Sequence, residues 1–384
     1  MSSAAFFDVD ALLDDPSTHI IVCCGSGGVG KTTTSAALGV RAAERGRRVC
    51  VLTIDPARRL AQSLGLHELD NTPRRVRGIG DKKGGALFAM MLDMKRTFDE
   101  IVEQHADPLR AQQILDNPLY QSMSSSFAGT QEYMAMEKLG QLHRESLADD
   151  QWDLIVVDTP PSRSALDFLD APQRLGSFLD GRFIRLLTVP ARAGGRAYLR
   201  MLGAGFGIVS GALTKILGAQ LLNDLQTLVA GLDSVFGGFR ERAEVTYSLL
   251  QAEGTSFVVV AAPERDALRE ASYFVERLQS DSMPLAGLVL NRAHRTGAVE
   301  LSADRAAGAA EALTRSGDHA LTASLLGLHA DRMRVVARER HLLERFRRAH
   351  PGVTVATATA LAGDVHDVAG LRAVAADLAQ EPAG

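Results

Sequence analysis

Short runs of apolar residues recur along the chain and are separated by longer stretches with helical spacing. Most of these runs are apolar throughout, which is typical of parallel strands covered by helices on both faces. They predict strands at Ile20–Cys24, Val49–Ile54, Leu87–Leu92, Leu154–Val157, Ser256–Ala261, Leu285–Leu290 and Gly352–Ala356. Strands that alternate with helices indicate an α/β fold with a doubly wound, mostly parallel sheet, whose ligand lies at the carboxyl ends of the strands.

The spacing of these runs is uneven. Two stretches, at about 95–150 and 176–253, have helical periodicity and contain no convincing strand. We expect both to be insertions that form a helical subdomain within one α/β domain of residues 1–384, rather than separate domains. The segment from Arg74 to Gly85 is rich in arginine, lysine and glycine, and predicts a surface loop.

Composition narrows the class of protein. The chain is 46% hydrophobic and 23% charged, as ordinary soluble globular proteins are. A net charge of −4 disfavours a nucleic-acid partner, which usually requires a basic surface. Three cysteines without C-x-x-C spacing exclude a disulfide framework and a cysteine zinc site. The N-terminus has neither a basic start nor a long apolar stretch, so we expect no signal peptide and a cytoplasmic location.

The most specific pattern is a glycine-rich segment, Gly25–Thr32, which fits G-x-x-x-x-G-K-[ST] in full. It follows the first predicted strand and precedes a helical stretch that ends near Gly46. Backbone N–H groups of such a loop point at phosphate oxygens, and the helix N-terminus adds positive charge. Lys31 is expected to reach the outer phosphates, and the Thr32 hydroxyl to hold Mg²⁺. The sequence therefore predicts an ATP-type site made of Gly27, Gly28, Val29, Gly30, Lys31, Thr32 and Thr33.

Polar residues close three other predicted strands. Asp55 is placed to orient water near the γ-phosphate and to join the metal site, but Asp followed by proline is an equally good helix N-cap. Asp158 is expected to bind Mg²⁺ directly or through water, with a loop-starting role as the alternative. The amide of Asn291 can both donate to and accept from an adenine edge.

Together these motifs resemble one family. The phosphate loop, Asp55-Pro56-Ala57, Asp158-Thr159-Pro160, Pro263-Glu264 and Asn291 occur in the order typical of the family of the arsenical pump-driving ATPase ArsA and the guided-entry ATPase of tail-anchored proteins. These are dimeric P-loop ATPases with a deviant Walker motif, of the SIMIBI class. The resemblance spans roughly residues 20–371 and is closest to an actinobacterial branch named for anion transport.

The resemblance implies a Mg²⁺-dependent ATPase whose dimer opens and closes around ATP. Asp55 and Lys31 would be catalytic, with Asp55 positioning the attacking water. Thr32, Asp55 and Asp158 would serve Mg²⁺, Asn291 would read adenine, and Pro263 and Glu264 would join the nucleotide site.

Two departures from the family pattern matter. The family's signature lysine, which reaches the partner's phosphates, is replaced by Ser26. Loss of such a cation costs on the order of a thousandfold in rate if nothing replaces it. Either Arg58 or Arg163 substitutes for the lysine, or the chain pairs with a paralogous ATPase that carries it. The loop after Asp158 also differs, since Pro161-Ser162-Arg163 stands where the family has a different switch sequence.

The helical insertions carry apolar stripes. One lies in the uncharged segment 201–214 and its continuation to Ile216, and another runs from Leu221 to Phe239. By position they resemble the subdomain that holds an apolar client in the targeting ATPase, and the insertion's own core is an equal alternative. Arsenite is disfavoured, because neither insertion contains a cysteine. We therefore expect an ATPase that binds an apolar client or membrane partner, with a catalytically weak nucleotide-binding subunit as the alternative.

Overall fold

The computed structural model describes residues 6–55, 59–118, 120–121, 131–149, 151–160, 238–298, 300–317 and 319–381. The chain divides into two compact units. The first comprises Met1–Met91, Asp149–Ala165 and Leu250–Gly384, and the second comprises Leu92–Ala148 and Leu166–Leu249. The first unit carries the sheet and the phosphate loop, and the described part of the second is helical.

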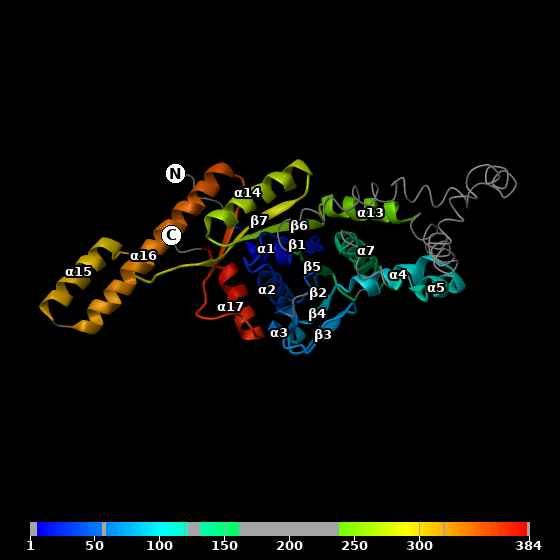
Figure 1. Ribbon diagram of the computed structural model, residues 1–384, viewed down its shortest axis with the longest axis horizontal. Helices are drawn as coiled ribbons and strands as arrows, with labels where there is room; N and C mark the ends of the chain where they lie inside the picture. The colour runs from blue at the N-terminus through cyan, green and yellow to red at the C-terminus, as the bar shows by residue number, and fades with distance from the viewer. Residues whose placement is uncertain are drawn as a thin grey trace, which may run out of the picture. The chain divides into compact units, whose positions relative to one another are not determined.

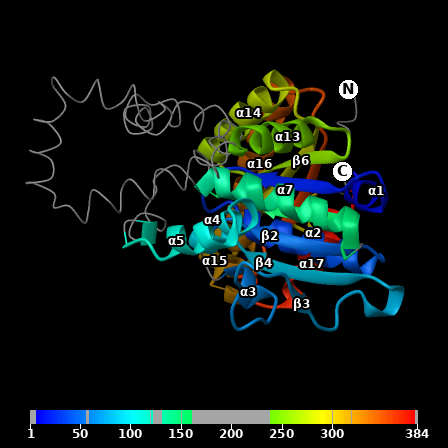
Figure 2. The ribbon, with the colours of Figure 1, turned by 90° about the vertical axis from the view of Figure 1, so that its right-hand side faces the viewer.

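The described strands of the first unit form one sheet in the order β3-β4-β2-β5-β1-β6-β7-β8. Every neighbouring pair is parallel except β3 and β4. Figures 1 and 2 show the strands β1, β2 and β4 in one layer. The strands are β1 (Ile20–Cys24), β2 (Arg48–Thr53), β3 (Arg74–Val76), β4 (Ala86–Met91), β5 (Leu154–Asp158), β6 (Thr255–Ala261), β7 (Leu285–Ala293) and β8 (Val355–Thr359).

The predicted α/β class and doubly wound sheet are confirmed, and each of the predicted strands is present. The last one lies three residues later than expected, at Val355–Thr359. The prediction of a surface loop from Arg74 to Gly85 is wrong in part, because Arg74–Val76 pairs antiparallel with β4 at the sheet edge. Three residues with two exposed arginines are too short and too polar to be recognised as a strand.

The handedness of the crossovers places the helices on the two faces of the sheet. From β1, α2 (Lys31–Glu44) leads to β2 on one side, whereas α14 (Arg265–Ser280) leads from β6 to β7 on the other. Because such crossovers are right-handed, α2 and α14 lie on opposite faces. Accordingly α17 (Val368–Leu378) packs on α2, and α16 (Ala320–Ala349) packs on α14. The remaining described helices of this unit are α1 (Val9–Asp14), α3 (Arg59–Ser63), α15 (Ala303–Ser316) and the short 3-10 helix η1 (Asp81–Lys83).

Burial of the central strands on both faces explains their apolar composition. All five residues of β1 are buried, as are all five of β5. Side chains that point toward α2 and α17 form one cluster with those helices, which includes Cys23, Val51, Val156 and Val260. The phosphate loop therefore begins at the end of a strand that is fixed on both sides by parallel neighbours.

The second unit contains α4 (Met94–His105), α5 (Pro108–Leu115) and most of α7 (Gln131–Asp149) and α13 (Phe239–Gln251). Asp93 and Asp107 cap the first two helices by accepting backbone N–H bonds. Two ion pairs link α7 to α4 and α13, namely Lys138 with Glu100 and Arg242 with Glu137, and in each pair the partner from α7 is buried. The segment 201–214 and almost all of the second stripe lie outside the described residues. Among the described helices, none combines the length and apolar character that crossing a membrane requires.

Candidate active site

Glycines give the phosphate loop a backbone that other residues rarely adopt. Gly25, Gly28 and Gly30 have φ values of 151°, 78° and 95°, in the region that favours glycine. A Cβ on Gly25 would lie 2.1 Å from the carbonyl oxygen of Val260 in β6, and one on Gly30 would lie 2.2 Å from Asn291 Nδ2. The loop is thus packed between β6 and the end of β7, and the N-terminus of α2 follows it directly.

Lys31 begins α2 and turns its ammonium back into the loop. Its Nζ donates to the carbonyl oxygens of Gly25 (3.0 Å) and Ser26 (2.9 Å), and the side chain is buried. Burial lowers the pKa of Lys31, whereas the negative charge of Asp158 acts in the opposite direction. An ammonium held only by neutral carbonyls can exchange them for phosphate oxygens, with which it forms stronger charge-assisted bonds.

Asp158 closes β5 beneath the loop and is fully buried. Its Oδ2 accepts from the hydroxyls of Thr32 (2.7 Å) and Thr53 (2.9 Å), and its Oδ1 has no hydrogen-bond partner. Burial raises the pKa of Asp158 to about 6, although both hydroxyl bonds and the charge of Lys31 lower it. A buried carboxylate oxygen without a partner is costly unless a ligand satisfies it.

The oxygen donors here fit a hard divalent cation. Thr32 and Asp158 supply a hydroxyl and a carboxylate within hydrogen-bond distance of each other, which is the donor set that Mg²⁺ takes beside a bound nucleotide. Mg²⁺ usually keeps several waters and phosphate ligands, so a protein cage is not required. In the described part of the chain no group of three His, Cys, Asp or Glu residues could hold a metal ion. This arrangement therefore suits a metal that is shared with a phosphate.

Thr53 was not identified from the sequence. The register of β2 and β5 places Thr53 beside Asp158, and its hydroxyl donates to the carboxylate. A threonine at the end of a buried strand carries no recognisable signal by itself. Only the order of the strands, which puts β5 between β2 and β1, shows that it faces Asp158.

Asp55 lies just beyond β2 and is half-buried. Its negative charge opposes the burial that lowers the pKa of Lys31 and adds to the burial that raises the pKa of Asp158. Its backbone carbonyl oxygen lies 3.4 Å from Thr53 Oγ1, whose one proton makes the shorter bond to Asp158. Residues 56–58, and with them Arg58, lie outside the described residues, as does Arg163.

The remaining predicted residues lie at the ends of β6 and β7. Asn291 is buried, and its Nδ2 donates to the Val29 carbonyl oxygen at 2.8 Å, so it holds the loop directly. Its neighbour Arg292, which sequence reasoning did not assign, donates from Nη1 to the Gly28 carbonyl oxygen at 3.0 Å. Pro263 is buried, and the exposed Glu264 is the N-cap residue of α14 without a side-chain cap bond. Because β6 lies beside β1 in the parallel sheet, Pro263 and Glu264 lie at the carboxyl ends of the strands, where the loop also lies.

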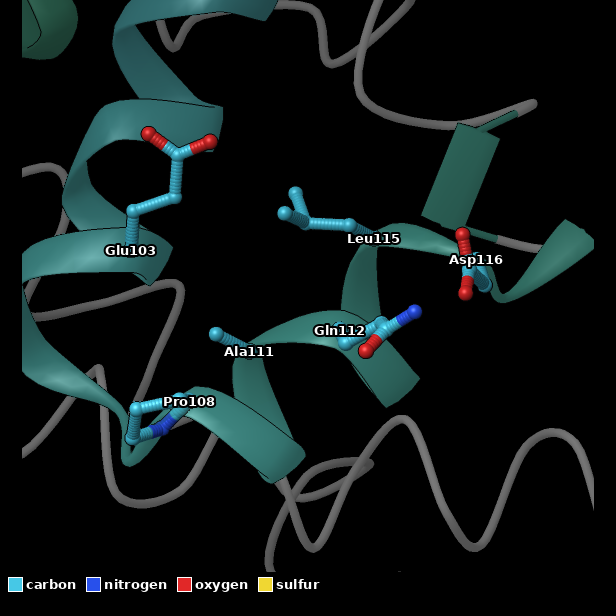
Figure 3. A pocket seen from close by; sticks show the side chains of 6 residues that line it. All are labelled: Glu103, Pro108, Ala111, Gln112, Leu115 and Asp116. Carbon is cyan, nitrogen blue, oxygen red and sulfur yellow. The ribbon is translucent and has the colours of Figure 1, made fainter.

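The helical unit contains a separate cavity of about 350 Å³ between α4 and α5. Figure 3 shows Ala111 and Leu115 of α5 pointing toward the side of the cavity that carries Glu103. Pro108, Gln112 and Asp116 complete its lining. Two carboxylates at its margins make it unsuited to a long apolar segment, so this cavity is not the predicted client groove.

The comparisons with known proteins agree with this geometry. A family model described as "Anion-transporting ATPase" matches residues 18–299, well over half of the chain. The chain is 28% identical over 310 residues to ATPase get3 of Aspergillus terreus, covering 76% of this chain and 80% of the relative. It is 26% identical over 303 residues to ATPase get3 of Pyrenophora tritici-repentis, with the same coverage, and 26% identical over 298 residues to the ATPase ASNA1 homolog of Cryptosporidium parvum, covering 76% and 71%. The chain is thus an ATP hydrolase and a member of the anion-transporting ATPase family.

Proposed function

We propose that the chain is a Mg²⁺-dependent ATPase that works as a dimer and uses its nucleotide cycle to bind and release an apolar client or membrane partner. The junction of Lys31, Thr32 and Asp158 carries the chemical part of the proposal. A buried ammonium and an unpartnered carboxylate oxygen meet at the mouth of a phosphate loop. These two groups suit a polyphosphate and its cation.

Each residue then has a defined task in hydrolysis. The backbone N–H groups from Gly27 to Thr33 bind phosphate oxygens, and Lys31 offsets the charge that develops on the transferred phosphoryl group. Bound Mg²⁺ would neutralise charge on the outer phosphates.

The carboxylates and the amide complete the proposed site. Thr32 and Asp158, with Asp55 nearby, orient the oxygen ligands of the metal. Asp55 also positions the attacking water, and its charge acts on Lys31 and Asp158. Among the described residues the Oδ1 of Asn291 has no hydrogen-bond donor, so it is available to accept from the adenine amino group. Pro263 and Glu264 border the base from the end of β6.

The client part rests on the resemblance to the targeting ATPase and on the helical unit. We propose one ATPase domain whose helical insertions, at about 95–150 and 176–253, receive the client. The protein would act in the cytoplasm and associate peripherally with the membrane through its client or membrane partner. Arsenite remains disfavoured, because the described cysteines are all buried strand residues of the sheet.

The first test is Mg²⁺-dependent hydrolysis of ATP by the purified full-length chain. We expect the wild type to release phosphate and EDTA to abolish this release. Lys31→Ala and Asp55→Asn should each reduce the rate at least about a hundredfold, whereas the control Arg269→Gln should leave it unchanged. Arg269 is an exposed residue of α14 whose one ion-pair partner among the described residues is Asp266, also exposed. Phosphate release that persists in Lys31→Ala would contradict the proposal.

A second candidate is a nucleotide-binding subunit that needs a lysine-bearing paralogue. Ser26 favours it, because the side chain at this position is buried and neutral, and no cation from it can reach a partner. Under this alternative the purified chain binds ATP tightly with the same dependence on Lys31 but turns it over slowly. Measurement of ATP affinity and turnover on the same preparation separates the two candidates.

A further inference from the structure

Arg292 occupies an unusual backbone conformation at the phosphate loop. Its φ is 62°, in the left-handed region that residues other than glycine rarely adopt. Among the described residues only Ser282 and His319 share this property, and their backbone hydrogen bonds are to Gln279 and Ala323 rather than to the loop. A left-handed non-glycine residue is a local strain that persists where surrounding structure holds it, and such strain is concentrated at functional sites.

A β-bulge accompanies this conformation. Leu290 pairs with Thr357 and Ala293 pairs with Thr359, so three steps along β7 face only two along β8. Bulges of this kind redirect side chains beside active sites. In a regular strand Asn291 and Arg292 would point to opposite faces of the sheet. Here both donate to the same loop, Asn291 to the carbonyl oxygen of Val29 and Arg292 to that of Gly28.

The charge of Arg292 is uncompensated. Its side chain donates to the neutral carbonyl of Gly28, and among the described residues no carboxylate lies within salt-bridge distance of it. Arg295 of the same segment is instead paired with Asp377, and Arg41 and Arg45 of α2 are paired with Asp10 and Asp14. Arg292 is exposed, and so are Gly27 and Gly28 beneath it. Within the described part of the chain, a guanidinium without a carboxylate partner therefore lies at an exposed part of the loop.

We infer that Arg292 is a nucleotide-binding residue that exchanges the Gly28 carbonyl for oxygens of the polyphosphate chain. Arginine presents several N–H donors in a planar fork that suits phosphate, and a charge-assisted bond to phosphate is stronger than one to a neutral carbonyl. The bulge and the left-handed backbone are then the means by which β7 aims two consecutive side chains at one loop. This inference rests on the proposed ATP site and adds a cation to it.

The test compares the affinities of ATP and AMP for the full chain, measured by calorimetry or by displacement of a fluorescent ATP analogue. We expect Arg292→Gln to weaken ATP about tenfold and AMP less than about twofold, because only ATP carries the outer phosphates. Arg292→Lys should retain most of the ATP affinity, since it keeps the charge. The matched control, Arg269→Gln, removes an exposed arginine of α14 and should leave both affinities unchanged.

A second variant separates binding from a structural role. Arg292→Gly relieves the left-handed backbone, so we expect its melting temperature without nucleotide to equal or exceed that of the wild type, while ATP binding weakens as in Arg292→Gln. Three results overturn the inference: wild-type ATP affinity in Arg292→Gln, an equal loss for ATP and AMP, or a lower melting temperature in Arg292→Gly that accounts for the loss. If the wild-type chain binds no ATP, the proposed function fails as well. If ATP binding is lost in Lys31→Ala but kept in Arg292→Gln, only the inference on Arg292 is overturned.

Discussion

Asp158 makes the stability of the metal-free protein depend on pH. Its pKa is raised by burial from 3.8 to about 6, so the folded state prefers the protonated carboxyl. Stability from this group is therefore complete below about pH 4 and is lost as the pH rises through about 6. We expect this loss to be about 3 kcal/mol. Denaturant unfolding in EDTA, compared between the wild type and Asp158→Asn across this range, measures it.

The comparison with Asp158→Asn isolates the one carboxyl, because other titrating groups are common to both proteins. The difference in unfolding free energy between them should change with pH in the stated direction and level off above about pH 7. Addition of Mg²⁺ and ADP at neutral pH should stabilise the wild type and leave the variant nearly unaffected. A difference that does not vary with pH would show that the carboxyl ionises in the folded state as freely as in the unfolded chain.

The glycines of the phosphate loop are not equivalent. Gly28 has a left-handed backbone but open space around its Cβ position, so Gly28→Ala should cost only the conformational strain of about 1–2 kcal/mol. Gly25→Ala would press a methyl group against the Val260 carbonyl in the central sheet, which cannot move aside. We expect Gly25→Ala to destabilise the protein clearly more than Gly28→Ala in thermal unfolding. Equal melting temperatures would contradict this packing.

At the scale of elements, α16 fixes the strand end that carries Asn291 and Arg292. Glu339 of α16 is buried, and its Oε2 accepts from the His294 backbone N–H at 2.8 Å. Its Oε1 is hydrogen-bonded to Nδ1 of the His294 ring at 2.6 Å. Glu339→Gln retains the shape but turns an amide donor toward one of these groups. We expect it to cost about 1–3 kcal/mol in unfolding free energy and to weaken ATP binding.

The control for this prediction lies on the same helix. Glu344 is exposed and pairs with Arg348 only at 3.9 Å, so Glu344→Gln should change stability by less than about 0.5 kcal/mol. Stability and ATP affinity are measured for both variants at the same pH and salt concentration. If Glu339→Gln behaves as Glu344→Gln does, α16 does not support the nucleotide site.

The elements that the sequence predicted well are those whose burial determines their composition. The strands β1, β2, β4, β5 and β6 are apolar along most of their length, because helices cover both faces of the sheet. Their predicted ends lie within one residue of the observed ones. The position of β8 was predicted three residues too early, because its residues, Val355-Ala-Thr-Ala-Thr359, give only a weak apolar signal. The bulge in β7 could not be predicted, since it depends on pairing with β8.

In the candidate site, too, only the residues that belong to a local sequence pattern were predictable. Glycine spacing identified the phosphate loop, and an apolar run closed by aspartate identified Asp158. The contacts of Thr53 and Arg292 depend on which strands lie side by side and on one backbone angle, and neither is encoded in local spacing. Sequence therefore predicts residues whose role comes with a motif, and misses residues that tertiary structure brings to it.

At the scale of the whole molecule, the proposed dimer determines how Ser26 affects turnover. A lysine introduced at this position extends from the buried second position of the loop, where it could reach the phosphates of a partner chain. We expect Ser26→Lys to raise the turnover of the purified chain by at least about tenfold, because it restores a cation at the transferred phosphoryl group. Phosphate release is measured over a range of protein concentrations, since a lysine that acts on the partner accelerates only the dimer.

Mass measurement shows whether that acceleration comes from the dimer. With Asp55→Asn to slow hydrolysis, ATP should shift the molecular mass from 41.1 kDa toward twice that value, and ADP should not. If Ser26→Lys leaves turnover unchanged while ATP still favours the dimer, a cation already present, such as Arg292, serves this role. If the chain stays monomeric with ATP, a dimer of two identical chains is ruled out, and of the two-chain arrangements only pairing with a paralogous ATPase remains.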